Sequence, residues 1–428
     1  MNSLKNDKLS ILGSGREVGK SELLFDSDKR ILLDCGIKVK DPETTVTGFP
    51  PIPKAVDCII IAHAHLDHSA FFPAVVKKRD CAVYGTPPTC AISELLIKDA
   101  KKIEPNLPFD PADIKYAFKK FIAIPYGVEQ DIGGIKFKFH NSGHIPGSSI
   151  VEVNSKGKKI VYTSDFKIEE TRLMKGSEVT ENVDTLIIET TYATRELPNR
   201  KDAEKKMLKD IQDTINKGGN VLMPAFAVGR TQEIALILYH YDIELPVFVD
   251  GMSTKVSDIF LNYPKYVKND ILFREAIGRL RIVGKEKSKA MREPSIIIAT
   301  AGMLEGGPAI SYLLALDKEY KETGKQSKVI FTGYSVEGTN SWLLQNKGMI
   351  HLKKKKGKKI KPIDINLPND LYHLSAHASR EDILKFIEKS NPEKIICVHG
   401  DETEKFAAEL KEKGYDAFGP KNGDVIEL

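Results

Sequence analysis

The hydrophobic positions in roughly the first 190 residues fall into short β-branched runs separated by turns. Eight such runs lie at residues 8–15, 30–36, 56–65, 81–86, 135–143, 148–154, 158–165 and 184–190. Several are apolar at consecutive positions, which predicts strands buried on both faces. Helical periodicity is sparser here and is clearest over residues 90–103. This part of the chain therefore predicts a sheet-rich domain with flanking helices.

From about Asp202 the pattern changes to a regular alternation of helix and strand. Helices are expected over residues 202–216, 231–241, 253–263 and 309–318, and strands over 220–226, 246–250, 295–300 and 328–334. Such alternation predicts a parallel α/β layer structure. A last strand, 394–401, lies between two helical stretches. Because this C-terminal segment is too small to fold alone, we expect it to return to the first domain.

Length and composition are consistent with a soluble protein of two domains. The chain has 428 residues, 41% hydrophobic and 29% charged, and single cores rarely grow beyond roughly 250 to 300 residues. No apolar run approaches the roughly 18 residues of a membrane span. The N-terminus lacks the apolar stretch of a signal peptide, so a cytoplasmic location without membrane partners is expected.

The net charge of +5 is modest for this length and does not by itself indicate a nucleic-acid partner. One segment, Lys353 to Lys361, concentrates lysines. Such a run can hold a phosphate backbone or can be a solvated loop, and charge alone leaves both readings open.

The segment HAHLDH places four metal-competent side chains directly after an apolar strand: His63, His65, Asp67 and His68. Core histidines rarely occur three at a time beside an aspartate, so the cluster predicts a metal site. Imidazole and carboxylate ligands suit zinc. His63 and His65 could reach one ion while Asp67 and His68 turn to a second, and two ions would need further ligands.

Three later residues follow apolar strands in the same manner and can supply those ligands: His144, Asp165 and His399. Taken singly, each has an ordinary structural explanation as a turn residue or helix cap. Together with HAHLDH they complete two zinc sites. Asp34 and Glu189 also end apolar strands, and we expect these carboxylates to hydrogen-bond the ligands rather than bind metal.

The order of these motifs resembles the metallo-β-lactamase hydrolase fold. Glu189 in LIIETTY, His377 in LSAHAS and His399 in VHGD resemble motifs A, B and C of the β-CASP nucleases. The opening LGSGREVGKS, LLDCG and HAHLDHS are similar to the cleavage and polyadenylation specificity factor endonucleases and their archaeal and bacterial relatives. The resemblance implies an αββα sandwich at 1–191, an inserted parallel α/β β-CASP domain at 192–357, and the end of the sandwich at 358–428.

The resemblance also implies roles for individual residues. One zinc ion would be held by His63, His65 and His144, the other by Asp67, His68 and His399, with Asp165 bridging. Catalytic roles fall to Asp67, Glu189 and His377, with His377 as general acid, and Ser375 and Ser379 would bind an RNA phosphate. Ser164 stands where relatives often have glycine, and it is expected to matter little because it binds no metal.

The function implied is hydrolysis of single-stranded RNA by a two-zinc enzyme. RNA-cleaving members of the family carry histidine at motif C, as His399 does here. Endonucleolytic cleavage is expected, with a 5′-to-3′ exoribonuclease of the ribonuclease J type as the alternative. Two alternatives come from other functional classes: a small-molecule metallohydrolase and a non-catalytic RNA-binding subunit. Related nucleases often dimerise, so a homodimer is compatible with the resemblance.

Overall fold

The computed structural model describes residues 7–38, 49–284, 287–352 and 361–428, which form two compact units. The first unit combines the described residues of Met1–Val39, Val46–Leu197 and Ala376–Leu428, and the second contains those of Pro198–Ser375. The lysine run from Lys353 to Lys361 falls outside the described residues except for the backbone of Lys361, so its role stays a prediction.

The first unit contains two sheets of seven strands each. In spatial order, one sheet consists of β22 (Val425–Glu427), β1 (Lys8–Ile11), β2 (Leu23–Asp26), β3 (Arg30–Leu33), β4 (Cys58–Ile60), β5 (Ala82–Gly85) and β6 (Phe121–Ala123). The other consists of β21 (Asp416–Phe418), β20 (Lys394–Val398), β11 (Thr185–Glu189), β10 (Lys158–Tyr162), β9 (Ser149–Ser155), β8 (Ile135–Asn141) and β7 (Gln130–Ile132). Strand β22 pairs with β1, so the last described residues of the chain complete the first sheet.

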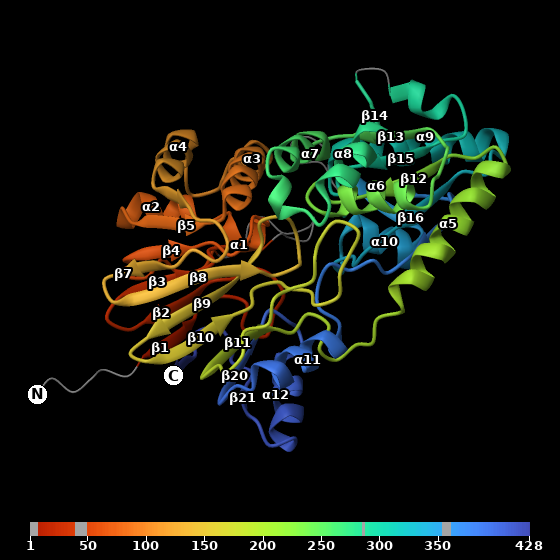
Figure 1. The fold of residues 1–428 in the computed structure, drawn as a ribbon. Helices are drawn as coiled ribbons and strands as arrows, with labels where there is room; N and C mark the ends of the chain where they lie inside the picture. The colour runs from red at the N-terminus through yellow and green to blue at the C-terminus, as the bar shows by residue number, and fades with distance from the viewer. Residues whose placement is uncertain (1–6, 39–48, 285–286, 353–360) are drawn as a thin grey trace, which may run out of the picture. The chain divides into compact units, whose positions relative to one another are not determined.

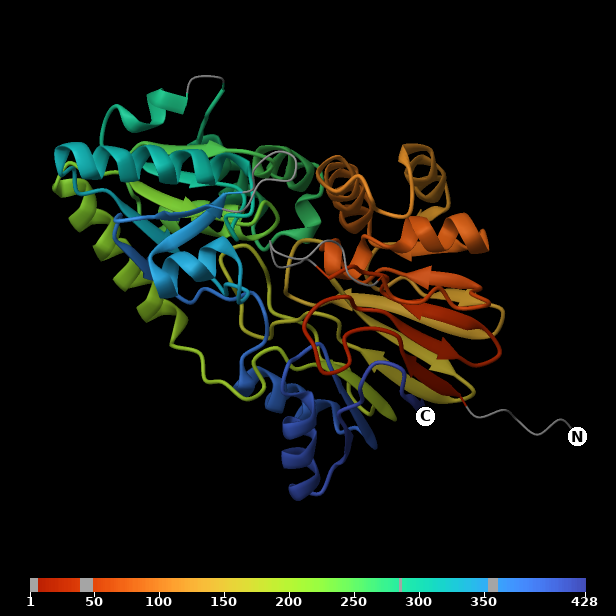
Figure 2. The ribbon, with the colours of Figure 1, turned by 180° about the vertical axis from the view of Figure 1, so that it is seen from behind.

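Side chains from both sheets form one core between them. Strand β8 shows why: its period of two buries Phe137 and Phe139, while Lys136 and Lys138 point the other way. The outer face of the first sheet packs on α2 (Phe72–Arg79), α3 (Pro87–Ile103) and α4 (Pro111–Lys119). The outer face of the second packs on α11 (Arg380–Ser390) and α12 (Thr403–Glu412). Figures 1 and 2 show these layers from opposite sides, and the predicted αββα sandwich is confirmed.

The second unit is a parallel sheet covered by helices on both faces, as predicted. Its strand order is β14 (Arg281–Ile282), β13 (Val247–Asp250), β15 (Ile296–Ala299), β12 (Val221–Pro224), β16 (Lys328–Phe331) and β19 (Asn369–Leu371). One face packs on α5 (Arg200–Asn216) and α6 (Arg230–His240), and the other on α9 (Gly307–Thr323) and α10 (Asn340–Lys347). The remaining elements are α7 (Ser253–Leu261), α8 (Asp270–Gly278), the 3₁₀ turns Pro264–Tyr266 and Lys287–Met291, and a hairpin of β17 (Met349–Leu352) and β18 (Lys361–Asp364).

The structure differs from the sequence prediction at the end of the inserted segment. The predicted boundary after residue 357 precedes β19, yet β19 pairs with β16 of the second unit. The compact units therefore divide between Ser375 and Ala376. The strand is only three residues long, too short to give a readable hydrophobic period. Among the described helices, none has the length and apolar content needed to cross a membrane.

A buried carboxylate on β9 gives a testable contribution to stability. Glu152 lies 3.0 Å from His140 Nε2 and accepts a hydrogen bond from Asn154. The contact with His140 outweighs burial and lowers the pKa of Glu152 to about 2. A depressed carboxyl pKa stabilises the fold above the ordinary pKa and loses that effect as pH falls towards the folded value.

We expect Glu152→Gln to lower the free energy of unfolding at pH 7 by about 2 kcal/mol. The gap to the wild type should narrow as pH falls from about 5 towards 3, as measured by urea unfolding. Glu178→Gln is the matched control, because Glu178 contacts the same histidine but its side chain is 62% exposed. Equal losses in the two variants, or a gap independent of pH, would contradict the assignment.

Candidate metal centre

The segment with most of the candidate ligands follows β4. This strand is fully buried and parallel to both β3 and β5. After it the chain passes through buried His63 and enters α1 (Leu66–Ser69), which carries Asp67 and His68. The Ser69 hydroxyl donates to two carbonyls of the preceding loop, at 2.9 and 3.0 Å. A rigid strand and local hydrogen bonds therefore fix this segment.

The other candidates also lie at strand ends of the first unit. Asp34 follows β3, His144 lies in the turn between β8 and β9, Asp165 follows β10, Glu189 ends β11 and His399 follows β20. Asp34 and His399 have left-handed backbones, with φ of 58° and 51°. For residues other than glycine this conformation costs about 1 to 3 kcal/mol and concentrates at functional sites. The strained backbones indicate that the surrounding fold sets the directions of the Asp34 and His399 side chains.

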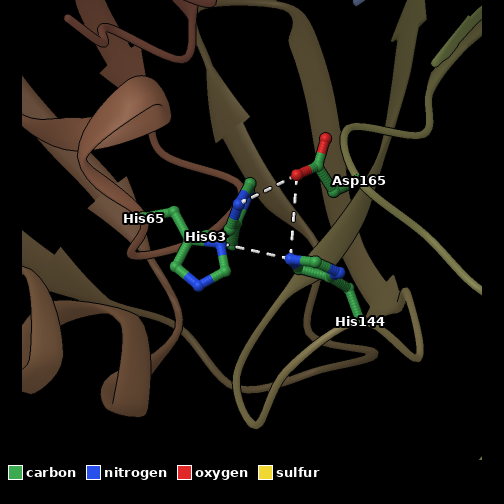
Figure 3. A group of neighbouring side chains, drawn as sticks. All are labelled: His63, His65, His144 and Asp165. Atoms are coloured by element: carbon green, nitrogen blue, oxygen red, sulfur yellow. Dashed lines mark hydrogen bonds and ion pairs between the residues drawn. The ribbon is translucent and has the colours of Figure 1, made fainter. Parts of the chain in front are cut away.

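The described residues form four groups that could hold a metal ion, and two of these contain the seven predicted ligands; the other two include Asp34 and Glu189. In the first of the two groups with the predicted ligands, one ligand atom from each of His63, His65, His144 and Asp165 lies within 4.8 Å of the others (Figure 3). In the second, Asp67, His68 and His399 meet the same limit. Each group has the nitrogen and oxygen donors that zinc takes in catalytic sites.

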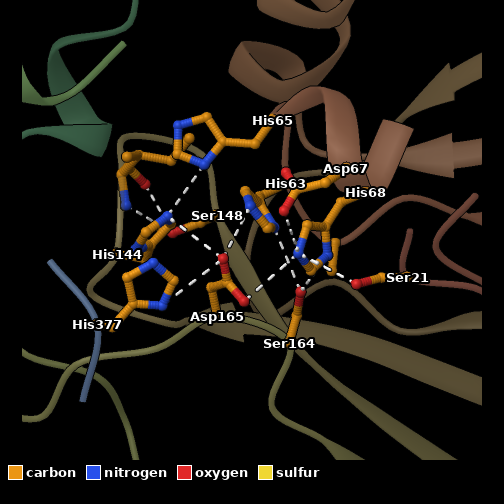
Figure 4. Close-up of polar contacts among 12 residues, drawn as sticks. Ser21, His63, His65, Asp67, His68, His144, Ser148, Ser164, Asp165 and His377 are labelled. Atoms are coloured by element: carbon orange, nitrogen blue, oxygen red, sulfur yellow. Dashed lines mark hydrogen bonds and ion pairs between the residues drawn. The ribbon is translucent and has the colours of Figure 1, made fainter. Parts of the chain in front are cut away.

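Asp165 lies between the two groups and faces both. Its Oδ2 is 3.4 Å from His63 Nε2 and 3.7 Å from His144 Nε2. Its Oδ1 is 3.4 Å from both His68 Nε2 and His399 Nδ1. Figure 4 shows the contacts with His63, His68 and His144 converging on the buried carboxylate. One oxygen is thus directed to each group, the arrangement that a shared ligand requires.

Several buried ligand atoms lack the partners that buried polar atoms normally have. His63 Nε2, Asp165 Oδ1 and His399 Nε2 have no hydrogen-bond partner among the described residues. Leaving such atoms unsatisfied costs roughly 1 to 3 kcal/mol each. All three belong to the two groups and lie 3.4 to 3.6 Å from atoms of other candidate ligands. The residues therefore fit bound metal cations.

Asp34 orients His68 from behind. Its Oδ2 lies 2.7 Å from His68 Nδ1 and accepts from the Tyr162 hydroxyl at 2.8 Å. Its Oδ1 accepts from the Ala62 backbone N–H at 2.7 Å. Both oxygens are thus engaged, and the His68 ring presents Nε2 to the site. A carboxylate behind a histidine ligand fixes the ring and its tautomer in this way.

His144 and His63 are also held from behind. His144 Nδ1 donates to the Ala376 carbonyl at 3.0 Å, which leaves Nε2 for the first group. The Ser164 hydroxyl lies 3.3 Å from His63 Nδ1 and donates to Asp34 at 3.1 Å. Ser164 was expected to matter little, and the structure instead places it against His63 and against Asp34, the carboxylate that orients His68. The sequence gives no signal for this contact, because it joins residues about 100 positions apart.

Burial and neighbouring charges set the protonation of the histidines. Burial, together with the nearby His68, holds the pKa of His63 well below its usual value. Burial and the neighbouring His377 do the same for the pKa of His144. At His68 burial also lowers the pKa, but Asp165, Asp34 and Asp67 outweigh it and raise the pKa to about 10. The negative charge of these three carboxylates favours a positive charge at His68. A bound metal cation can supply that charge in place of the proton.

His377 lies beside the two groups without belonging to either. Its Nδ1 is 3.2 Å from Glu189 Oε1 and 3.8 Å from Asp165 Oδ2. The other Glu189 oxygen accepts from the Thr191 backbone N–H at 3.1 Å. Burial lowers the pKa of His377, but Asp165 and Glu189 overcome it and raise the pKa to about 9. Glu189 thus holds the ring in place beside the two groups.

The two serines expected to bind phosphate have other contacts in the structure. Ser379 is the N-cap of α11 and accepts from the Asp382 backbone N–H at 3.1 Å. Ser375 belongs to the second unit, where its carbonyl accepts from Arg200 at 3.3 Å. Their phosphate-binding role stays a prediction.

An αββα sandwich with clustered histidine and aspartate ligands at its strand ends defines a metal-dependent hydrolase. Comparison with known families matches residues 23–194 to the metallo-beta-lactamase superfamily domain and residues 231–342 to the Beta-Casp domain. Residues 363–420 match the Zn-dependent metallo-hydrolase RNA specificity domain.

Similar proteins span nearly the whole chain. A probable RNase MJ4 of Methanocaldococcus jannaschii is 35% identical over 97% of this chain and 99% of its own length. The RNase aCSPSF2 of Saccharolobus solfataricus is 32% identical over 100% of this chain and 86% of its own. The transcription termination factor FttA of M. jannaschii is 37% identical over 92% of this chain and 67% of its own length. The crystal structure of a protein of unknown function from Enterococcus faecalis V583 shares the fold, with a TM-score of 0.64 and 14% sequence identity. The match covers 99% of this chain and 100% of that one.

The chain therefore belongs to the β-CASP family of metal-dependent ribonucleases within the metallo-β-lactamase superfamily. The predicted family and enzyme class are confirmed.

Proposed function

We propose that this protein is a two-zinc endoribonuclease that hydrolyses phosphodiester bonds of single-stranded RNA. The observation that carries the proposal is the pair of ligand groups on either side of Asp165, with buried donor atoms that have no hydrogen-bond partner among the described residues. The RNA specificity match at residues 363–420 and the relatives described as RNases favour RNA as the substrate. They also weigh against a small-molecule hydrolase.

In this proposal His63, His65 and His144 hold one zinc ion and Asp67, His68 and His399 the other, with Asp165 shared. Asp34 orients His68 and is not itself a ligand. A non-catalytic RNA-binding subunit would be expected to have lost ligands, whereas all seven are present here. The domain carrying the site is the first compact unit, and the second unit is the inserted β-CASP domain.

Two bound zinc ions would supply a water nucleophile at neutral pH and neutralise charge on the phosphoryl oxygens. The protein's own groups supply the proton transfers. The Asp67 side chain is 25% exposed whereas that of Asp165 is 3% exposed, so Asp67 can accept a hydrogen bond from the attacking water. His377, held by Glu189, donates a proton to the leaving 3′ oxygen. Ser375 and Ser379 would position a neighbouring phosphate.

Endonucleolytic cleavage is tested with one RNA sequence in linear, 5′-labelled form and in circular form. We expect the zinc-loaded protein to cut both, because an internal phosphodiester is sufficient for the chemistry. Products are resolved by gel electrophoresis, and Asp165→Asn serves as the inactive control. Mononucleotide release from the linear form with an intact circle would instead assign 5′-to-3′ exonuclease activity of the ribonuclease J type. If neither RNA is cleaved and a chromogenic ester is hydrolysed, the protein is instead a small-molecule metallohydrolase.

The proposal includes a cytoplasmic location and single-stranded RNA as the partner. A homodimer is also proposed, and sedimentation at micromolar concentration tests it. A single species with the mass of one chain would contradict it.

A further inference from the structure

The exposed large hydrophobic side chains of the second unit form two groups by their place in the fold. Ile271, Leu272 and Ile282 lie on α8 and on the edge strand β14. Phe226, Tyr334 and Val336 lie in the loops that follow β12 and β16. Phe226 is 43% exposed and Tyr334 39% exposed. The second group thus brings two aromatic rings to loops where a parallel sheet commonly binds ligands, beyond the carboxyl ends of its strands.

Strand order brings the loops that carry the two rings to the same edge of the sheet. β12 and β16 are neighbouring parallel strands, with Val221 opposite Lys328. Continuing that register puts Phe226 opposite Gly333, one residue before Tyr334. Neighbouring strands lie roughly 4.8 Å apart, so both aromatic residues leave the sheet at the same level.

Glycines follow the neighbouring strands on both sides of the loop that carries Phe226. Gly302 follows β15, the other neighbour of β12, and a β-carbon there would lie 3.0 Å from the Phe226 backbone nitrogen. On the β16 side, a β-carbon at Gly333 would lie 3.6 Å from the Arg230 guanidinium. Neither of these positions carries a side chain, and the Phe226 side chain is among the exposed large hydrophobic ones.

A fixed cation lies at the same place. Arg230 begins α6, four residues after Phe226, and its guanidinium donates to the Leu374 carbonyl. That contact and the approach to Gly333 hold the charged group near the loop that carries Tyr334. An aromatic surface beside an arginine suits a ligand with flat apolar rings and anionic linkers, which is the chemistry of single-stranded nucleic acid.

We propose that Phe226 and Tyr334 form a platform on which unpaired bases of the RNA substrate stack. The inference rests on the proposed ribonuclease function and adds a base-binding site in the second unit. Stacking depends on the π-face that every base has, so the platform binds bases without selecting a sequence. It would favour single-stranded over duplex RNA, because paired bases do not expose their faces.

The test uses the zinc-loaded full-length protein and an oligoadenylate of about 12 nucleotides. Phe226→Leu and Tyr334→Leu remove the rings and keep apolar side chains. Each is expected to raise KM about tenfold, within the range for losing one base-stacking contact, and to leave kcat within about twofold. Ile282→Ala is the matched control, because Ile282 is 70% exposed in the same unit outside the aromatic group. It should leave both constants unchanged.

Two further measurements separate stacking from other causes. A fluorescent adenine analogue moved along the oligonucleotide should be quenched by the wild type at one or two positions, and less by the variants. When those nucleotides are made abasic, wild type and variants should have equal KM. If both variants keep the wild-type KM and the wild-type quenching, the proposal that bases stack on these rings is wrong. The rings would then be assigned to contact with a protein partner. Equal losses on abasic RNA would also overturn that proposal. A wild type that cleaves no RNA would refute the ribonuclease function, while the quenching would still test the platform.

Discussion

Replacing Asp165 by asparagine is expected to abolish RNA cleavage and to reduce zinc below two ions per chain. The carboxylate directs Oδ2 to His63 and His144, and Oδ1 to His68 and His399. An amide keeps one acceptor oxygen and replaces the other with an N–H donor, so it can serve only one group. It also removes the negative charge that balances the two cations. We expect a fall in kcat of at least about 10³-fold, since metal stabilisation of the transition state supplies several kcal/mol.

Elemental analysis of the purified variant and RNA cleavage under single-turnover conditions measure the two effects. Asp416→Asn makes the same chemical change at an exposed position and should keep wild-type zinc and rate. His65→Ala is a second variant of the first group at a partly exposed position, which keeps the test informative if the buried substitution prevents folding. Two zinc ions and wild-type cleavage in Asp165→Asn would refute the shared-ligand assignment.

The candidate ligands could be predicted from the sequence because each follows a readable apolar strand. More than 300 residues separate the first of these ligands, His63, from the last, His399. Each nevertheless follows a strand with a clear apolar pattern: β4 before His63, β10 before Asp165 and β20 before His399. β4 is parallel to its neighbours in one sheet, and β10 and β20 are both parallel to β11 in the other. Within each sheet, parallel strands bring such ends to one edge, so pattern and topology agree. The two Asp165 oxygens face different groups, and that placement can be seen only in the folded chain.

The contacts that orient those ligands could not be predicted in the same way. Tyr162 and Ser164 reach Asp34 across roughly 130 positions, through side chains that have common roles in any strand or turn. The same limit applies to the fold. Most of the long apolar elements were predicted with their type, whereas short strands such as β6, β7 and β19 and the helices α4 and α8 were not. The pairing of these short strands is set by the neighbouring strand rather than by their own hydrophobic period.

Replacing His377 by alanine is expected to lower kcat by about 10² to 10⁴-fold, the usual contribution of a general acid, with both zinc ions retained. The ring is not a member of either ligand group. Its Nδ1 lies 3.2 Å from Glu189 Oε1, which holds the ring in place. Glu189, which is not proposed as a ligand, is one of the carboxylates that raise the pKa of His377 and so favour a ring that carries a proton.

A substrate with sulfur in place of the leaving 3′ oxygen separates proton donation from positioning. A thiol ionises near pH 8.5, so a thiolate can leave without a proton from the enzyme. The defect of His377→Ala should therefore shrink to within about tenfold on this substrate, while Asp165→Asn should remain inactive on both. His373→Ala, four residues earlier on the chain and in the other unit, is the control and should match the wild type. An equal defect on the oxygen and sulfur substrates would make His377 a positioning residue, and loss of zinc would make it a ligand. Only a selective rescue by the sulfur substrate assigns the proton to this ring.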